Sequence, residues 1–495
     1  MYESLLQSLI CESRPGLASN GMKTTQYIDI PRQTKIVATL GPATTEQKVL
    51  ESLIDAGLSV ARMNMSHGDH KEHALRVKNL RKAAEVKRAH VGVLVDLAGP
   101  KIRTGELSTE TVDLVPGKKL ILTTEKVIGT AAKMSVNYTR LPREVKAGGF
   151  IMLDDGRRKL FIEKIVGNEI HTKILIGGSI KPRRGVNVPG AYLSLSAITA
   201  KDKKDIVFAI EQKAEYVALS FVRTVKDVTD ARKLLSGAKD QPLIIAKIET
   251  PEAVDNIDAI LAECDGIMIA RGDLAIEVPR EMVPVIQKTL IRRARAQRKL
   301  VITATQMLET MIKNPVPTRA EVSDIANAIF DGTDAVMLSE ESAMGEYAKE
   351  AVAMMRSVAL ATDKEISIWT PGIDIEEPID AIKKESCTIA ELVGAKAIIA
   401  LTETGNAPQK IAAFKTKFPI IALTDKPFIA RRLSLVRGVW PILYKSVKNI
   451  PELQTSVKEI VTEYKIAKKG DRVVVVSGMM FGKPSNSNML FVETI

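Results

Sequence analysis

Cysteine, aromatic side chains and long apolar runs are all scarce in this chain. Its 495 residues include three cysteines (Cys11, Cys264 and Cys387), which are too scattered for a disulfide framework or a cysteine metal site. Aromatic residues make up 4%, and no Lys/Arg tract is interleaved with them, so we interpret the net charge of +12 as a solvated surface with sites for anionic substrates. The longest apolar runs have strand length, which excludes a membrane span. We therefore expect a cytoplasmic protein that binds neither nucleic acid nor membrane.

The most regular feature of the sequence is a series of short apolar runs. The runs are rich in Val, Ile and Ala and do not alternate with polar residues, as expected for strands buried on both faces. Helical patterns such as Glu46–Asp55, Lys71–Lys87 and Arg280–Arg298 lie between them. Eight strand–helix repeats predict an α/β fold of the (β/α)8 barrel type. The predicted strands are Ile36–Leu40, Val60–Met65, Val91–Leu97, Tyr216–Phe221, Leu243–Ile248, Gly266–Ala270, Leu300–Ala304 and Ala335–Leu338.

Two further segments differ in character from the barrel. Short alternating runs punctuated by Gly predict a small inserted β-barrel lid domain over residues 104–190. The barrel would then comprise residues 31–103 and 191–362. After a Pro/Gly-bearing linker, alternating strand and helix patterns predict a separate open α/β domain over 363–495. Residues 1–30 are expected to form a loose extension, with Met22 as an alternative start.

Polar residues stand at the carboxyl ends of the predicted barrel strands, where such barrels carry their active sites. Lys247 and Glu249 are two residues apart along a strand and therefore point the same way. This pair suits an anionic substrate with a metal ion, although a simple ion pair is the plainer interpretation. Asp273 follows the next strand after Gly272, and with Glu249 it offers the two carboxylates that commonly hold Mg²⁺.

The second strand repeats this spacing with Arg62 and Asn64. Arg62 presents a planar fork to a phosphoryl oxygen, while Asn64, Ser66 and Asp96 offer oxygen ligands for a second, weaker cation. His67 fits a surface hydrogen-bonding role better than a catalytic one. Anion clamps, a divalent site and one Lys together indicate phosphoryl transfer, and no Ser-His-Asp arrangement or Gly-rich phosphate loop points elsewhere.

Seven motifs in the barrel resemble the pyruvate kinase family, and the resemblance extends from about Thr34 to the C-terminus. It implies phosphoryl transfer from phosphoenolpyruvate to ADP, giving pyruvate and ATP as the last step of glycolysis, by a homotetramer. An aldolase- or mutase-like barrel and a non-catalytic regulator are the alternatives. The motifs are Thr34–Thr44, Ala61–Gly68, Ile245–Glu249, Ala270–Leu274, Ala304–Glu309, Pro317–Glu321 and Met337–Ala343.

The resemblance implies a role for each matching residue. Glu249 and Asp273 would hold Mg²⁺ or Mn²⁺, Lys247 and Arg62 would bind the phosphoryl group, and the backbone at Gly272 would take the substrate carboxylate. The proton-delivery side would comprise Thr305, with Ser339 and Glu341 behind it. The positions that match the family's nucleotide site are Thr39, Pro42, Asn64, His67, Arg103, Asp155 (in the lid) and Arg184.

One departure from the family concerns the monovalent cation. Asn64, Ser66, Asp96 and Leu97 match the family's monovalent site, but the chain reads Asp-Leu-Ala-Gly-Pro-Lys where potassium-dependent members resemble Asp-Thr-Lys-Gly-Pro-Glu. Lys101 therefore puts a fixed ammonium where those enzymes carry Glu. We predict a potassium-independent enzyme whose monovalent site is weak or unused.

The remaining departures are smaller. Ala275 and Glu340 stand where the family has Gly, which is tolerable if their φ angles are negative. Arg183 and Arg184 replace Lys and keep the charge. In the C-terminal domain, the turn Thr402, Thr404 and Gly405 before a helix fits either a phosphorylated-sugar effector site or an ordinary turn.

Overall fold

The computed structural model describes residues 32–366, 375, 378–445, 447–478 and 488–495. The predicted N-terminal extension and most of the linker before the C-terminal domain lie outside these residues. Eight parallel strands form a closed barrel in the order β1-β16-β15-β14-β13-β12-β3-β2, which confirms the predicted fold class. The strands are β1 (Lys35–Thr39), β2 (Val60–Asn64), β3 (Gly92–Asp96), β12 (Tyr216–Leu219), β13 (Leu243–Ile248), β14 (Gly266–Ala270), β15 (Leu300–Ala304) and β16 (Ala335–Leu338).

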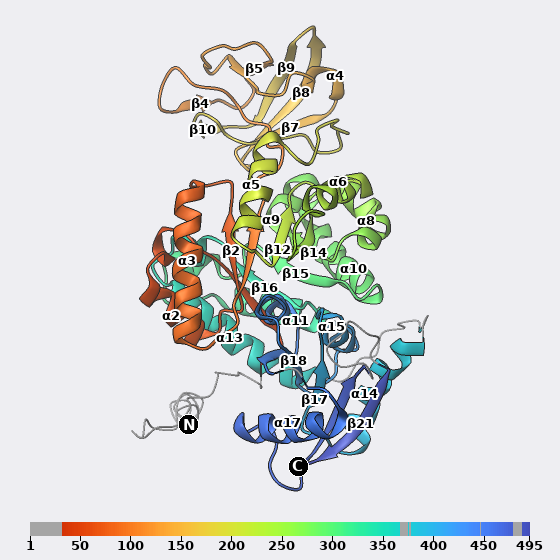
Figure 1. Ribbon diagram of the computed structural model, residues 1–495. Coiled ribbons are helices and arrows are strands. Elements are labelled where there is room, and N and C mark those ends of the chain that lie inside the picture. Colours follow the sequence, from red (N-terminus) through yellow and green to blue (C-terminus); the bar gives the residue numbers. More distant parts are fainter. Residues whose placement is uncertain (1–31, 367–374, 376–377, 446, 479–487) are drawn as a thin grey trace.

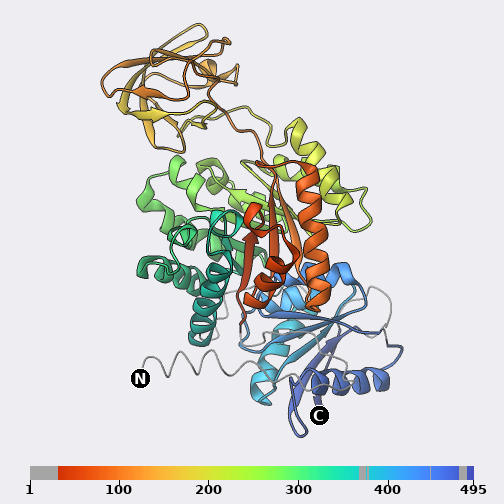
Figure 2. The same ribbon diagram turned by 90° about the vertical axis from the view of Figure 1, so that its left-hand side faces the viewer.

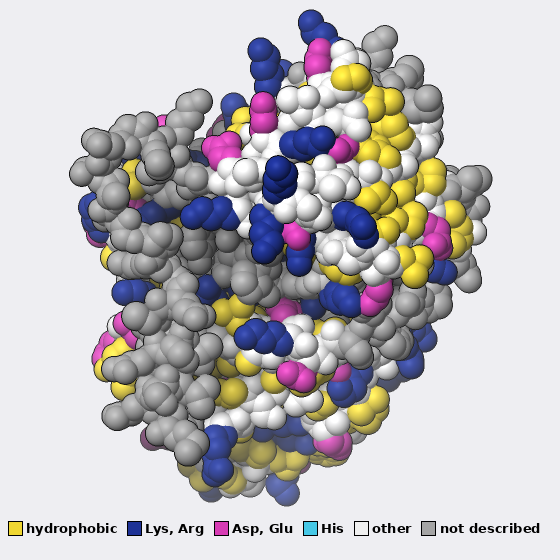
Figure 3. All heavy atoms as spheres, turned by 90° about the horizontal axis from the view of Figure 1, so that it is seen from below, with side chains coloured by type: hydrophobic (Ala, Val, Ile, Leu, Met, Phe, Trp, Pro, Cys, Tyr) yellow, Lys and Arg dark blue, Asp and Glu magenta, His cyan; other side chains and the backbone are white. Residues whose placement is uncertain are grey.

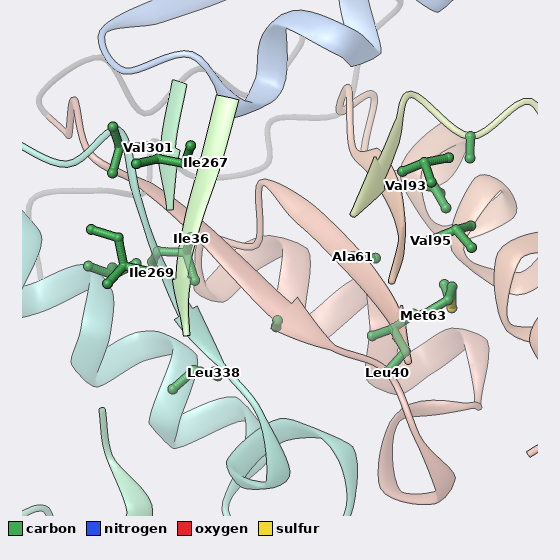
Figure 4. Close-up of a cluster of buried hydrophobic side chains, with 14 of the residues drawn as sticks. Ile36, Leu40, Ala61, Met63, Val93, Val95, Ile267, Ile269, Val301 and Leu338 are labelled. Atoms are coloured by element: carbon green, nitrogen blue, oxygen red, sulfur yellow. The ribbon is translucent and has the colours of Figure 1, made fainter. Parts of the chain in front are cut away.

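Helices surround this barrel because the outward face of its strands is apolar. The inward face is apolar as well and fills the barrel interior. On β1, for example, Ile36 and Ala38 pack outward against the helices, whereas Val37 packs into the interior. Figure 4 shows the outward layer, with side chains from neighbouring strands gathered beneath the helices. The main helices are α2 (Gln47–Ala56), α3 (His70–Val86), α5 (Ala200–Glu211), α6 (Val225–Leu235), α7 (Pro251–Asp255), α8 (Ile257–Glu263), α9 (Arg271–Glu277), α10 (Val283–Ala296), α11 (Arg319–Asp331), α12 (Glu340–Ala343) and α13 (Ala348–Glu365).

The insertion between β3 and β12 lies beyond the carboxyl ends of the barrel strands (Figures 1 and 2). A six-stranded sheet, β11-β7-β8-β9-β5-β6, and a two-stranded sheet, β10-β4, share one apolar core. The insertion is thus two sheets around a common core rather than one closed barrel. Its elements are β4 (Val112–Leu114), β5 (Lys119–Thr123), β6 (Lys133–Ser135), α4 (Leu141–Glu144), β7 (Phe150–Leu153), β8 (Arg158–Val166), β9 (Glu169–Ile176), β10 (Gly178–Ile180) and β11 (Val186–Asn187).

The C-terminal domain packs against the opposite end of the barrel (Figure 1). Its five-stranded sheet has the order β19-β18-β17-β20-β21, with β21 antiparallel to β20. Seen from below, Lys and Arg side chains are spread over the visible surface with Asp and Glu side chains among them (Figure 3). The elements of the C-terminal domain are α14 (Pro378–Leu392), β17 (Ile398–Leu401), α15 (Asn406–Ala412), β18 (Ile420–Thr424), α16 (Pro427–Arg432), β19 (Val439–Leu443), α17 (Ile450–Glu463), β20 (Arg472–Ser477) and β21 (Met489–Thr494).

The first residues of several barrel strands make the contact with the C-terminal domain. Lys35 Nζ donates to the carbonyl of Val439 at 2.7 Å. Gly92 N donates to Ser434 Oγ at 3.1 Å, and a Cβ on Gly92 would lie only 2.9 Å from that oxygen, so this close approach requires glycine. The amino ends of the strands are therefore closed by the C-terminal domain, and the carboxyl ends face the insertion. Among the described residues, no helix is both long and apolar enough to cross a membrane.

Candidate active site

Charged side chains from neighbouring strands meet at the carboxyl end of the barrel, here called the barrel mouth. Arg62 points inward from β2 and donates through Nε to Asp96 Oδ2 of β3 at 2.6 Å. Its Nη1 donates to Thr39 Oγ1 of β1 at 2.9 Å. All three side chains are buried, and they come from strands that pair in register. The structure thus brings together three residues that the sequence assigns to the site.

Lys247 lies at the centre of this group. Its Nζ is 2.9 Å from Glu249 Oε1 and 3.3 Å from Asp96 Oδ1, and it donates to Ser220 Oγ at 2.8 Å. Burial opposes the charge on Lys247, but Asp96 and Glu249 outweigh it and raise the pKa above its ordinary value. The two carboxylates therefore favour the charged form of Lys247 at the barrel mouth.

Glu249 and Asp273 have the properties expected of a divalent-cation site. Glu249 is fully buried, and its Oε2 accepts the N–H of Phe221 at 2.7 Å. Its Oε1 is buried and faces Lys247, but the two groups are not aligned for a hydrogen bond. Burial and the nearby charge of Asp273 raise the pKa of Glu249, while Lys247 lowers it. A divalent cation would relieve the repulsion between these two carboxylates and satisfy the unbonded oxygen.

A strained turn follows β15. Thr305 and Gln306 have φ angles of 69° and 54°, a region that non-glycine residues rarely adopt. Thr305 Oγ1 accepts the N–H of Gly272 at 2.8 Å, so the amide that the sequence assigns to the substrate carboxylate is satisfied by this hydroxyl. Arg271 supports the turn, since its Nη2 donates to Thr305 O at 2.7 Å and its Nη1 to Asp324 at 2.7 Å.

Glu341 lies behind this turn and joins the loops after β15 and β16. Its carboxylate accepts the N–H groups of Leu308 at 3.2 Å and Ser339 at 2.6 Å. Burial raises the pKa of Glu341. In the structure Glu341 positions the backbone around Ser339, and its recorded partners are main-chain amides rather than Thr305.

The residues that the sequence assigns to the nucleotide are split between the mouth and the insertion. Arg103 and Arg184 lie on the two segments that connect barrel and insertion, where Arg103 pairs with Gly185 as an antiparallel bridge. Asp155 belongs to the turn after β7, and its Oδ1 lies 3.4 Å from Lys101 Nζ. The structure thus places the Lys101 ammonium against an insertion carboxylate.

Loops at the mouth carry Pro42 and His67, both exposed. Pro42 opens a short 3-10 turn after β1, and the carbonyl of His67 accepts from His73 Nε2 at 2.8 Å. Two oxygens expected to bind a monovalent cation already have protein donors. Asn64 Oδ1 accepts the N–H of Ser66 at 3.1 Å, and the carbonyl of Leu97 accepts from Ser220 Oγ at 2.6 Å.

Two departures from the family are accommodated as expected. Ala275 lies within α9 and Glu340 opens α12, and neither has a positive φ angle. In the C-terminal domain, Thr402 Oγ1 accepts the N–H of Gly405 at 2.8 Å, which closes the turn before α15. The carbonyl of Thr404 accepts from Arg432.

Two contributors received no role from the sequence. Ser220 links Lys247 to the carbonyl of Leu97, and Arg271 holds the strained turn. Both are polar residues at strand ends, so the pattern that found the other residues includes them. Their partners, however, lie on other strands and on α11, which the sequence pattern does not reveal.

A closed (β/α)8 barrel with a buried ammonium, two interacting carboxylates and an arginine at its mouth defines a barrel enzyme of the kind that handles anionic substrates. Comparison with known proteins identifies the family to which this enzyme belongs. The family model "Pyruvate kinase, barrel domain" matches residues 31–352, and "Pyruvate kinase, alpha/beta domain" matches residues 380–493. The chain belongs to the pyruvate kinase family and is a phosphotransferase.

Pyruvate kinases from other organisms align with nearly the whole of this chain. The pyruvate kinase of Geobacillus stearothermophilus is 42% identical over 479 residues, which cover 94% of this chain and 80% of that protein. Pyruvate kinase 2 of a Synechocystis strain is 41% identical over 475 residues, covering 95% and 80%. The crystal structure of a pyruvate kinase from Cryptosporidium parvum superposes with a TM-score of 0.89 at 36% identity, covering 94% of this chain and 96% of that one.

Proposed function

We propose that this enzyme transfers the phosphoryl group of phosphoenolpyruvate to ADP in a magnesium-dependent reaction, giving pyruvate and ATP, the last step of glycolysis. The observation that carries the proposal is the cluster at the barrel mouth, in which Lys247 lies within 3.3 Å of two buried carboxylates. Family membership supports the same reaction.

Glu249 and Asp273 would hold the divalent cation, Mg²⁺ or Mn²⁺. Their donor set is all oxygen, and the buried, unbonded Oε1 of Glu249 fits such an ion. Two carboxylates completed by substrate oxygens are a common way for a protein to hold Mg²⁺. When bound, the cation would neutralise charge on the phosphoryl and enol oxygens.

The side chains at the mouth supply the remaining charge and geometry. In the proposed reaction, an oxygen of the terminal phosphate of ADP attacks phosphorus and the bond between phosphorus and the enol oxygen breaks. Lys247 and Arg62 stabilise the charge on the phosphoryl group in transfer and on the departing enolate. A proton then reaches the methylene carbon from the side of Thr305, while Ser339 and Glu341 shape that wall. The result is pyruvate.

The insertion would act as a lid that carries nucleotide contacts. Asn187 Nδ2 donates to Glu277 Oε1 at 2.9 Å, and Gly156 lies against Ile276, so the insertion already contacts the helix that holds Asp273. We propose that Asp155, Arg103 and Arg184 approach the nucleotide from this side, with Thr39, Pro42, Asn64 and His67 on the barrel side. Closure would exclude water from the transfer.

We expect the enzyme to need no potassium. Ser220 satisfies the carbonyl of Leu97, Arg62 and Lys247 flank Asp96, and Lys101 adds a fixed charge near the lid. Initial rates at saturating Mg²⁺ should therefore differ by less than about twofold between KCl and tetramethylammonium chloride at equal ionic strength. K101E should introduce a potassium requirement. Activity that disappears without K⁺ in the unsubstituted enzyme would refute this expectation.

Other properties follow the family and remain proposals. We propose a homotetramer in the cytoplasm, and a phosphorylated-sugar effector that contacts the turn of Thr402, Thr404 and Gly405. The turn lies directly before α15, and its hydroxyls and backbone are the groups that would contact the effector.

The decisive experiment couples product formation to lactate dehydrogenase. Pyruvate should appear only when phosphoenolpyruvate, ADP and Mg²⁺ are all present, with ATP formed in equal amount. Consumption of phosphoenolpyruvate without ADP would indicate another oxoacid-handling barrel enzyme. Folded protein that binds substrate without turnover under any of these conditions would indicate a non-catalytic relative.

A further inference from the structure

A charged cluster next to the end of β2 has no part in the reaction as proposed so far. It comprises Lys201 and Asp205 of α5 and His70 of α3. Lys201 Nζ donates to the carbonyl of Met65, the first residue after β2, at 2.7 Å. The N–H of Met65 donates to the carbonyl of Asp96 at 2.9 Å. The backbone at Met65 is therefore held through its N–H by β3 and through its carbonyl by a lysine of α5.

A buried carboxylate holds this lysine in place. Asp205 is fully buried, and its Oδ2 lies 2.7 Å from Lys201 Nζ while its Oδ1 lies 2.7 Å from His70 Nε2. The ring of His70 stacks on Phe208 with the ring centroids 4.7 Å apart. Asp205 needs such partners, because burying an unpaired carboxylate is far more costly than burying a paired one. The contact thus differs from an ordinary helix surface pair, in which both groups remain solvated.

Two residues close to Met65 are among those proposed to contact the nucleotide. Asn64 ends β2 directly before Met65, and His67 follows in the loop. The side chains of Ser66 and His67 are exposed, so they are accessible to a ligand. The carbonyl of His67 is held by His73 of α3, whose Nε2 lies 2.8 Å away. The loop backbone is therefore fixed at two carbonyls, one by α5 and one by α3.

The first turn of α5 also contacts both segments that connect the barrel to the insertion. Asp202 is fully buried, and its Oδ1 accepts the N–H of Gly99 at 3.1 Å. Gly99 lies on the outgoing segment between β3 and β4. The Oδ2 of Asp202 accepts the N–H of Thr199, which ends the returning segment, at 2.8 Å. Neighbouring residues of α5 thus join the loop after β2 to both connections of the insertion.

We propose that Lys201 is a positioning residue for ADP, which fixes the loop after β2 through the carbonyl of Met65 and is itself fixed by Asp205. A loop held in its binding conformation pays less ordering entropy when the ligand binds. Loss of the contact should therefore weaken ADP binding. It should change phosphoryl transfer little, because Lys247 is carried by β13, which β12 and β3 separate from β2. The identity of the ligand rests on the proposed function.

The split between the two Michaelis constants tests this role. Initial rates of pyruvate formation are measured with ADP varied at saturating phosphoenolpyruvate, and with phosphoenolpyruvate varied at saturating ADP. K201M should raise the KM for ADP at least about fivefold and leave kcat and the KM for phosphoenolpyruvate within about twofold, as expected when an interaction common to ground and transition state is lost. An unchanged KM for ADP in folded K201M refutes the proposal. Equal increases in both constants refute it as well, because Lys201 would then have a general structural role.

Three further variants separate this contact from its surroundings. K204M removes an exposed lysine of the same helix and should behave as the unsubstituted chain does. K201R keeps the charge and the donors, so its KM for ADP should return to within about threefold of the unsubstituted value. A K201R enzyme as impaired as K201M would contradict the proposal. K201M/D205N removes the ion pair as a unit and leaves neither charge buried alone, so it tests the same increase if K201M does not fold.

Calorimetric titration of the full chain with ADP and Mg²⁺ needs no turnover, so it separates this proposal from the proposed reaction. K201M should bind ADP at least about fivefold more weakly than K204M does. If the unsubstituted chain makes no pyruvate but K201M still binds ADP more weakly, the proposed reaction fails and the positioning role stands. If pyruvate forms normally and both variants bind ADP equally, the positioning role fails and the reaction stands. A chain that neither binds ADP nor makes pyruvate refutes both.

Discussion

K247M is expected to lower kcat by about a thousandfold, the scale seen when one preorganised electrostatic donor to a transition state is removed. The Lys247 ammonium is held by Ser220 and two carboxylates, so it needs no rearrangement to meet charge developing on the substrate. Steady-state rates of pyruvate formation measure the effect. A folded K247M enzyme with kcat within tenfold of the unsubstituted chain would contradict the proposed role.

Stability must be separated from catalysis in this variant, because K247M leaves Glu249 and Asp96 buried with one cation fewer. Lys415 provides a matched control, since its buried ammonium pairs with Asp334 at 2.7 Å far from the mouth. Each substitution breaks a buried pair and should cost about 3–5 kcal/mol of unfolding free energy in denaturant titration. K415M should nevertheless keep kcat within about threefold, so a large kcat loss confined to K247M would be catalytic in origin.

The barrel was predictable from sequence because its signal is local. Each strand is a short apolar run buried on both faces, and all eight expected strands are present within about two residues of their expected limits. Pro284 shows how local chemistry also sets boundaries. The expected helix Arg280–Arg298 is a 3-10 turn followed by α10, with Pro284 in the first turn of the helix. The two- and three-residue strands β6, β10 and β11 of the insertion carry no such signal.

The contacts within the site were harder to predict from the sequence, because they join distant parts of the chain. Lys247 and Glu249 share a strand, so their proximity follows from the two-residue period. By contrast, Arg271 reaches Asp324, which is 53 residues away, and the hydroxyl of Thr305 caps the amide of Gly272. Such pairs depend on how neighbouring strands and helices pack, which the residue pattern alone does not specify.

The contact made by Lys101 could not be predicted from the sequence either. The sequence identifies an unusual ammonium next to the expected monovalent site, but the structure pairs it with Asp155 of the insertion. The partner became visible only once the insertion was placed relative to the barrel. Lys101 therefore also contacts the lid, and K101E, tested with and without K⁺, measures whether its charge takes the place of a mobile cation.

E249Q is expected to weaken divalent-cation binding by at least about tenfold, since loss of even an outer partner of a metal ligand commonly costs 10–100-fold. The substitution keeps the size of the side chain, and the amide oxygen can still accept the N–H of Phe221. What it removes is one negative charge beside Asp273. Binding of Mn²⁺, followed by electron paramagnetic resonance in the presence of phosphoenolpyruvate, measures this loss directly.

The activity of E249Q should also fall, by at least about a hundredfold in kcat/KM at low Mg²⁺. It should recover in part as the Mg²⁺ concentration is raised, because the carboxylate of Asp273 still attracts the ion. Glu252 supplies the matched control. It lies three residues further along the chain, in the first turn of α7, and its ion pair is with Arg223 at 3.9 Å. E252Q should leave Mn²⁺ binding unchanged. If E249Q bound Mn²⁺ as tightly as E252Q does, the cation would have to be held elsewhere, and Glu249 would serve only to balance the charge of Lys247.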